Sequence, residues 1–310
     1  MSVAAIDCGT NSTRLLIADD AGRVLRREMR ITRLGEDVDA TGTLADAALQ
    51  RNFDVLTQYA TYMREAHVTR SRLVATSAAR DAANGAFFLE RAAEITGARV
   101  ALLSGHEEAQ LSLRGATADL PDVEAPTMIL DIGGGSTEMA AMVNGELLAF
   151  SMQLGCVRVT ERATGVGILT PAARERANDM IAAELQRAWS QVPGFEGLVG
   201  NVRVVGLAGT VATLSQLVAG VAEYDRERVH HQRLTLSNVV EWCERLGREE
   251  PAARLRFPGM VAGREDVLPA GLLILESVML RCAVGEILSS ENDILDGLAA
   301  TMVTDVDDEP

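Results

Sequence analysis

The chain has 310 residues, of which 47% are hydrophobic and 24% charged, the composition of a soluble globular protein with room for two domains. Acidic residues outnumber basic ones by 44 to 29, and the net charge of −15 argues against binding to nucleic acid or to a membrane surface. No apolar run approaches the roughly 20 residues of a membrane helix. The N-terminus lacks a signal-peptide pattern, so we expect a cytoplasmic location and no membrane partner.

The lysine, arginine, cysteine and histidine content excludes several kinds of catalytic and metal site. All 29 basic residues are arginine, which excludes a Walker A lysine and a Schiff-base lysine, so a phosphate would be held by arginine, backbone amides or a metal ion. The four cysteines lie far apart without a C-x-x-C partner, which predicts buried, reduced thiols. His230 and His231 are adjacent, and neighbouring residues on a strand face opposite sides, so we expect no shared metal there.

The N-terminal part predicts strands around a tight turn. An apolar strand at 3–6 ends at Asp7, residues 7–14 read Asp-Cys-Gly-Thr-Asn-Ser-Thr-Arg, and further strands are expected at 15–18 and 23–33. Alternating elements follow, with helices at 43–66, 86–96 and 106–118 and strands at 72–77 and 99–103. Gly97 is placed to end the second of these helices.

The same unit begins again near the middle of the chain. A strand at 128–130 leads into Asp-Ile-Gly-Gly-Gly-Ser-Thr-Glu at 131–138, and a strand at 139–143 ends at the hairpin signal Asn144-Gly145. Four residues recur at a constant offset, with Asp7, Gly9, Ser12 and Thr13 matching Asp131, Gly133, Ser136 and Thr137. This internal repetition makes a chance origin of either turn much less credible.

The second half also alternates helices and strands. Helices are expected from Thr170-Pro171 to 192, from 211, from a Ser237 cap to 246, at 267–284 and at 294–303, with strands at 202–207 and 287–289. We therefore predict an α/β protein of two similar domains, with a phosphorylated ligand gripped in an inter-domain cleft. The first domain takes residues 1–120 and a C-terminal helix at about 297–305, the second takes 121–296, and 305–310 form an acidic tail.

Each glycine turn suggests a phosphate site. Glycine lacks a Cβ, so the amide N–H groups at 133–135 can point into one small space and admit an anion. The flanking carboxylates, Asp131 and Glu138, suit a divalent cation that accompanies a phosphate. The alternative is a hairpin turn with ordinary acids at the strand ends.

Three more segments carry candidate residues. Glu107 and Glu108 open a helix, where acids are favoured by the helix dipole alone, and the functional alternative is that one of them is a base. Arg80 lies where a strand ends and a helix begins, so it either clamps a phosphate or forms a surface ion pair with Asp81 or another nearby acid. Gly209 and Thr210 occupy a second strand-to-helix turn, as a cap or as a ligand contact.

These motifs together resemble the exopolyphosphatase / guanosine pentaphosphate phosphohydrolase (Ppx/GppA) family, in a short form without the C-terminal helical domains of longer members. The family belongs to the superfamily of actin, hexokinase and Hsp70. The matching motifs cover almost the whole chain in the family's order: DCGTNSTRLLIA at 7–18, ATSAARDAAN at 75–84, SGHEEAQL at 104–111, DIGGGSTE at 131–138, GLAGTVATL at 206–214 and GREDVLPAG at 263–271.

The resemblance implies two actin-like domains, each with an RNase H-like sheet, and hydrolysis of the terminal phosphoanhydride of inorganic polyphosphate. It implies Mg²⁺ or Mn²⁺ as the cofactor and guanosine penta- and tetraphosphate as further ligands, and it leaves a homodimer open. It makes Glu108 the general base and gives the metal to Asp131 and Glu138. Phosphates would be held by Gly9, Thr10, Asn11, Ser12, Arg80, Gly133, Gly134, Gly135 and Ser136, with Asp7, Gly209 and Thr210 as additional candidates.

Two departures from the family pattern leave the base and the turns unchanged: one affects substrate contacts near the base, and the other reverses a charge close to a predicted domain junction. Gln110 stands where many members carry arginine, and Ile-Leu-Asp-Gly at 294–297, including Asp296, stands where many read Leu-Arg-Glu-Gly. Two other functions stay open. One is an alarmone-binding sensor with weak or no catalysis, and the other is an ATP-dependent small-molecule kinase of the same superfamily.

Overall fold

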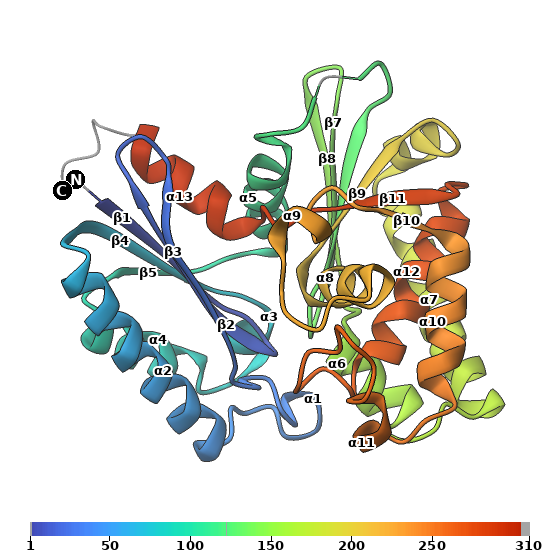
Figure 1. Ribbon diagram of the computed structural model, residues 1–310, viewed down its shortest axis with the longest axis horizontal. Coiled ribbons are helices and arrows are strands. Elements are labelled where there is room, and N and C mark those ends of the chain that lie inside the picture. Colours follow the sequence, from blue (N-terminus) through green and yellow to red (C-terminus); the bar gives the residue numbers. More distant parts are fainter. Residues whose placement is uncertain (1, 122, 305–310) are drawn as a thin grey trace. The chain divides into compact units, whose positions relative to one another are not determined.

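The computed structural model describes residues 2–121 and 123–304, and the chain divides into two compact units (Figure 1). The first unit consists of Met1–Ala118 and Asn292–Pro310, and the second of Asp119–Glu291. The sequence placed these boundaries after residues 120 and 296 instead. The acidic tail predicted at 305–310 lies outside the described residues.

The first unit is built on a mixed sheet in the order β3-β2-β1-β4-β5. The strand β1 pairs antiparallel with β2 and parallel with β4, and it is buried along its whole length. Alternate residues of β1 enter different cores, Ala4 and Ile6 one and Val3 and Ala5 the other, as the two-residue period of a strand requires. The strands are β1 (Ser2–Cys8), β2 (Ser12–Asp19), β3 (Val24–Ile31), β4 (Val68–Ala75) and β5 (Arg99–Leu102).

Helices cover both faces of this sheet, with α2 and α4 on one face and α13 on the other (Figure 1). The helix α13 packs closely on α5 because each contributes a glycine: a Cβ on Gly115 would lie 2.7 Å from the nitrogen of Gly297. The helices are α1 (Val38–Thr41), α2 (Asp46–Glu65), α3 (Ser77–Asp81), α4 (Gly85–Thr96), α5 (Gly105–Thr117) and α13 (Ile294–Thr304).

The second unit repeats the same sheet, in the order β8-β7-β6-β9-β11, with β10 added at its edge. Again the central strand β6 pairs antiparallel with one neighbour, β7, and parallel with the other, β9. This order and these directions confirm the expected α/β class with RNase H-like, actin-like sheets. The strands are β6 (Thr127–Ile132), β7 (Thr137–Val143), β8 (Glu146–Met152), β9 (Arg203–Leu207), β10 (Arg233–Thr235) and β11 (Glu286–Ser289).

One large core joins this second sheet to its helices. The apolar helix predicted at 267–284 is the buried α12, with Leu272, Ile274 and Val278 in that core. The helical elements are α6 (Cys156–Val159), the π-helical turn η1 (Thr160–Thr164), α7 (Pro171–Gln191), the 3₁₀ turn η2 (Pro193–Leu198), α8 (Ala208–Ala219), α9 (Arg226–Val229), α10 (Leu236–Gly247), α11 (Pro251–Arg254) and α12 (Leu268–Arg281).

The ends of α7, α4 and α10 can be compared with the predicted capping residues. The Thr170 side chain accepts a hydrogen bond from the amide of Ala173, and Gly97 has the left-handed φ of 66° expected of a C-terminal glycine, so both predictions are confirmed. The Ser237 cap is wrong. The helix α10 is capped by Thr235 instead, because Thr235 and Asn238 form a reciprocal capping box around its first turn.

A buried arginine anchors loops of the second unit. The Arg254 side chain is fully buried, and its guanidinium donates to four backbone carbonyl oxygens, those of Leu246 (2.9 Å), Val166 (3.2 Å), Gly167 (2.6 Å) and Glu265 (2.6 Å). Five fixed donors in one planar group suit such a set of acceptors. The loops at 166–167 and 265 are therefore held through one side chain.

Replacing Arg254 by Met should destabilise the protein by about 3 kcal/mol, because several buried carbonyls lose their donor at once. The control is Arg256→Met, which removes an exposed arginine paired with Glu249 and should change stability by less than about 0.5 kcal/mol. Urea unfolding followed by circular dichroism measures both. Equal stabilities of the two variants would contradict the anchoring role.

Candidate functional site

The first glycine turn joins β1 to β2 and is closed by its own backbone. The amide of Gly9 donates to the carbonyl oxygen of Ser12 at 3.0 Å. Asp7 ends β1 beside the turn, and its cross-strand partner Arg14 binds its carboxylate through Nε (3.0 Å) and Nη2 (2.5 Å). Arg14 also pairs with Asp293. Burial raises the pKa of Asp7, and the arginine opposes that rise. The unit thus neutralises this carboxylate with its own arginine.

The second turn has the same closure but different charges. The amide of Gly133 donates to the carbonyl oxygen of Ser136 at 3.0 Å. Asp131 lies directly opposite Glu138 on the antiparallel pair β6–β7, so both side chains project from the same face of the sheet. Both are buried, with 7% and 1% of their surface exposed. Glu138 accepts a hydrogen bond from the Ser151 hydroxyl at 2.6 Å.

This pair of carboxylates has the donor chemistry of a divalent-cation site. Two buried like charges in adjacent cross-strand positions repel one another, and a hard cation with oxygen ligands relieves that repulsion. In the first turn the residue equivalent to Glu138 is Arg14, a cation supplied by the chain itself. Of the two turns, the second therefore fits a metal ion, and Asp131 and Glu138 are the residues that would hold it.

The two glutamates that open α5 have separate environments. Glu107 is exposed and forms a capping box, its carboxylate accepting from the amide (2.8 Å) and the hydroxyl (2.7 Å) of Ser104. These bonds lower the pKa of Glu107. Glu108 is instead buried, with 8% of its surface exposed, and its Oε2 lies 3.6 Å from Nη1 of Arg80. The capping alternative thus applies to Glu107, and Glu108 is the candidate for chemistry.

Arg80 is fixed from the end of β4. It lies on the short helix α3, and its Nη1 donates to the carbonyl oxygen of Leu103 at 2.7 Å as well as facing Glu108. The nearby acid with which it pairs is therefore Glu108 rather than Asp81. An arginine held beside a buried carboxylate keeps positive charge available for an anion at the same place.

Gly209 and Thr210 begin α8 and pack tightly on a residue whose role the sequence did not reveal. A Cβ on Gly209 would lie 2.6 Å from Cζ of Arg264, whose Nη1 donates to the Gly209 carbonyl (2.8 Å) and to Thr213 (3.0 Å). A Cβ on Gly271 would collide with the Thr210 hydroxyl and lie 2.8 Å from its Cγ2. The motifs at 206–214 and 263–271 therefore meet in space, and glycine is needed at both contacts.

The four cysteines are buried and form no disulfide, as their spacing predicted. Cys156 begins α6 next to the second glycine turn, and burial raises its pKa to about 11. A thiol with so high a pKa is a poor nucleophile near neutral pH. Cysteine chemistry is therefore no part of the candidate site.

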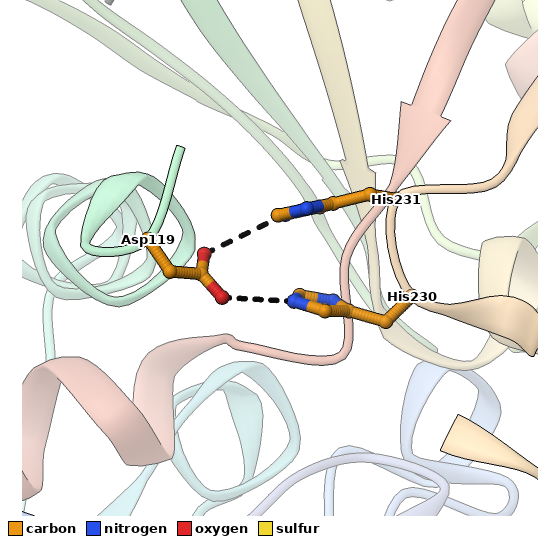
Figure 2. A group of neighbouring side chains, drawn as sticks. All are labelled: Asp119, His230 and His231. Atoms are coloured by element: carbon orange, nitrogen blue, oxygen red, sulfur yellow. Dashed lines mark hydrogen bonds and ion pairs between the residues drawn. The ribbon is translucent and has the colours of Figure 1, made fainter. Parts of the chain in front are cut away.

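The adjacent histidines of the second unit do not face opposite sides, and that expectation is wrong. Figure 2 shows both rings turned towards Asp119, with Nε2 of His230 at 2.9 Å and Nε2 of His231 at 3.5 Å from its carboxylate. The rings stack with centroids 3.8 Å apart. The reason is that the pair lies in a turn before β10, where His231 has a left-handed φ of 56°, so the alternation of a strand does not apply.

Three side chains this close could coordinate a metal, but the proton on His230 argues otherwise. The amide of Glu291 donates to its Nδ1 at 3.0 Å, so Nδ1 is unprotonated and Nε2 carries the proton of the neutral ring. That Nε2–H donates to Asp119, and a protonated nitrogen has no lone pair for a metal. His230 is therefore held by hydrogen bonds to Asp119 and Glu291, and the ring of His231 stacks on it.

His231 should make the protein less stable in mild acid. Burial first, then His230, lowers its pKa, so the unfolded chain takes up the proton before the folded one does. Stability from this residue is complete above the ordinary histidine pKa of about 6.5 and is lost as the pH falls below it. Melting temperatures should therefore fall less steeply with acidification in His231→Asn, because asparagine tolerates the left-handed φ.

The control for this prediction is His67→Asn. His67 also has a left-handed φ, 50°, but it is exposed. Its pH profile should match that of the wild type between about pH 5 and 7. If His231→Asn also follows the wild type across this range, the predicted linkage is wrong.

Two repeated RNase H-like units, each with a glycine turn beside a buried acid, define a two-unit α/β class of protein. The chain matches the Ppx/GppA phosphatase family over residues 16–303. It is 38% identical over 316 residues to Exopolyphosphatase 2 of Mycobacterium tuberculosis, covering 97% of this chain and 98% of that protein. The chain therefore belongs to the Ppx/GppA phosphatase family.

Solved structures agree with this assignment. A crystal structure of an exopolyphosphatase-like protein superposes with a TM-score of 0.91 at 32% identity, covering 98% of this chain and 99% of that one. The Ppx/GppA family member of Aquifex aeolicus superposes with a TM-score of 0.79 at 28% identity, covering 99% of each chain. Within residues 2–121 and 123–304, no helix combines the length and hydropathy needed to cross a membrane.

Proposed function

We propose that this protein is an exopolyphosphatase, which hydrolyses the terminal phosphoanhydride of inorganic polyphosphate and releases orthophosphate. The observation that carries the proposal is Glu108, a buried carboxylate held beside Arg80 at the start of α5. Membership of the Ppx/GppA phosphatase family and the likeness to the mycobacterial exopolyphosphatase support it. The glycine turns alone would support only phosphate binding.

In the proposed mechanism Glu108 is the general base. Its carboxylate accepts a proton from the water that attacks the terminal phosphorus. Arg80 contributes positive charge for the phosphate oxygens while it keeps Glu108 in place. Phosphoryl transfer depends mainly on positioning and on neutralising charge, so a base, an arginine and aligned amides are the parts that the chain must supply.

The family suggests a divalent metal, and we propose Mg²⁺, with Mn²⁺ as its substitute. Asp131 and Glu138 would hold it, and when bound it would offset the charge of the phosphate oxygens. Asp7 is the weaker candidate, because Arg14 already occupies its carboxylate.

Phosphate oxygens would be bound by amides and hydroxyls of the two turns. The amides of Gly9 and Gly133 close their own turns, so these two residues would contribute shape rather than N–H donors. The donors that we assign to phosphate are those of Thr10, Asn11, Ser12, Gly134, Gly135 and Ser136.

A phosphate-release assay tests the proposal. Short polyphosphate, long polyphosphate and guanosine pentaphosphate are each incubated with the protein and Mg²⁺. Release from polyphosphate supports an exopolyphosphatase, and release from guanosine pentaphosphate adds the related alarmone reaction, which breaks the same kind of bond. Tight binding of guanosine tetraphosphate without any turnover would favour a sensor instead. Phosphorylation of a small acceptor by ATP would favour a kinase.

A further inference from the structure

A short segment after the third strand of each unit donates backbone hydrogen bonds to the back of a glycine turn. In the first unit this segment is residues 32–35. The amide of Thr32 donates to the carbonyl oxygen of Asn11 at 3.1 Å, and the amide of Gly35 to that of Thr10 at 2.9 Å. We call residues 32–35 the first backing segment. It ties down the carbonyl groups of the turn, on a side that no substrate group would occupy.

The second unit has an equivalent in residues 155–158, the second backing segment. They follow β8 and begin α6. The amides of Cys156 and Val157 donate to the carbonyl oxygens of Gly133 and Gly134, both at 2.9 Å. Both units thus bind the carbonyl groups of their glycine turn through backbone amides. The segment that does so is a loop in the first unit and the start of a helix in the second.

The geometry of the peptide bond sets the direction of the N–H group that follows each bound carbonyl. In a planar trans peptide the C=O and the following N–H point in opposite directions. A carbonyl that is bound to a backing segment therefore turns the next N–H away from that segment. The amides fixed in this way are those of Asn11 and Ser12 in the first turn and of Gly134 and Gly135 in the second.

We propose that the two backing segments are positioning elements for catalysis, which aim these four amides at the phosphate groups of the substrate. This inference rests on the proposed function, because it assigns the amides to phosphate. Donors that are already oriented need no reorganisation when charge develops on the substrate. The backing segments therefore act on turnover through the turns, without touching the substrate.

Close approach of each backing segment to its turn requires glycine. A Cβ on Gly155 would collide with the Gly134 carbonyl and lie 2.5 Å from the nitrogen of Gly135. A Cβ on Gly35 would collide with the Thr10 side chain and lie 3.1 Å from that of Ala78. Gly155 has an ordinary extended backbone (φ −138°), so space is the reason for glycine there.

Arg51 holds the first backing segment from outside the turn. It lies on α2, and its guanidinium donates to the carbonyl oxygens of Thr32 (2.9 Å) and Arg33 (3.3 Å) and to the carboxylate of Glu36 (2.7 Å). Its side chain is 40% exposed, so it is no part of the core. Arg51 is thus a positioning residue whose loss should affect the turn more than the fold.

Two variants with matched controls test the proposal. Gly155→Ala is compared with Gly197→Ala, a glycine whose added Cβ would meet nothing within 4 Å. Arg51→Met is compared with Arg91→Met, an exposed helical arginine paired only locally with Glu94. We expect Gly155→Ala to lower kcat/KM about 100-fold and Arg51→Met about 10-fold, since misplacement of about 1 Å can cost 100-fold.

Comparing kcat with melting temperature distinguishes a role in positioning the turns from a role in folding. We expect kcat to fall in both variants. The melting temperature of Arg51→Met should stay within a degree or so of its control. Gly155→Ala should also lose stability, because its Cβ meets the backbone of the second turn, so its kcat is taken per folded molecule. Arg51→Lys should not restore kcat, because a compact ammonium group lacks the separated donors of the planar guanidinium that reach two carbonyls and a carboxylate. A wild-type kcat in Arg51→Met would overturn the proposal for the first backing segment. A wild-type kcat in Gly155→Ala would overturn it for the second backing segment. If either variant is unstable, its kcat per folded molecule decides.

Binding of pyrophosphate, measured by calorimetry, keeps this test independent of turnover. A wild type that releases no orthophosphate from any substrate removes the proposed function. The backing segments are then judged on affinity alone, with weaker pyrophosphate binding in Gly155→Ala and Arg51→Met than in their controls as the supporting result. Equal affinities in all four variants would contradict the orienting role.

Discussion

Replacing Glu108 by Gln should lower kcat for phosphate release about 100-fold or more, with little change in KM, because general-base catalysis contributes about 10² to 10⁴ in rate. Glutamine preserves the size of the side chain and one acceptor oxygen, but it cannot accept the proton of the attacking water. Glu108 is buried beside Arg80, so the substitution also removes half of an ion pair, and the melting temperature is measured alongside the rate.

The preceding residue supplies the matched control. Glu107 is exposed and belongs to the capping box of α5, and glutamine can take its place in such a box. Glu107→Gln should therefore keep both its activity and its melting temperature. Phosphate release from long polyphosphate, followed with a colorimetric assay, compares the two variants. An unchanged rate in Glu108→Gln, or an equal loss in both variants, would rule out Glu108 as the base.

The separation of these two glutamates shows what the sequence could and could not predict. The helix start, its serine cap and the presence of two acids were all readable from local pattern. Which of the two acids is buried depends on which face of α5 packs against the rest of the unit. The local sequence pattern does not indicate that face. Only resemblance to a family favoured Glu108, and the structure adds the physical reason, since Glu107 is occupied by Ser104.

The fold itself was largely predictable because it is repeated. The constant offset between Asp7 and Asp131, with Gly9 and Gly133 two residues on, required two similar sheets, and both sheets have the same strand order. The errors arose where a backbone angle departs from the usual regions. The side chains of His230 and His231 were expected to face opposite sides, as on a strand, and the left-handed φ of 56° at His231 instead brings its ring onto that of His230.

Contacts between distant segments were the least predictable part. Arg264 and Gly209 are 55 positions apart, and neither position alone suggests the contact. The same is true of Arg51 and the loop at 32–36. One signal was available, however. Extending the offset between the two repeats by one residue pairs Arg14 with Glu138 and reveals that the two turns carry opposite charges at this position.

This difference in charge predicts that Glu138 contributes to binding of a divalent cation. Arg14 neutralises Asp7 within the first unit, whereas Asp131 faces Glu138 within the second. If Asp131 and Glu138 hold a divalent cation, Glu138→Gln should weaken its binding at least about tenfold, since the affinity of such sites depends on the number of charged oxygen ligands. The maximal rate at low metal concentration should fall in parallel.

Calorimetric titration with Mn²⁺ measures this affinity without turnover, and the dependence of phosphate release on Mg²⁺ concentration measures it during catalysis. The control is Glu146→Gln, an exposed acid at the start of the neighbouring strand β8. Loss of affinity in Glu138→Gln that high Mg²⁺ restores, with Glu146→Gln unchanged, is the expected result. If both variants bind Mn²⁺ as the wild type does, the carboxylate pair has another role.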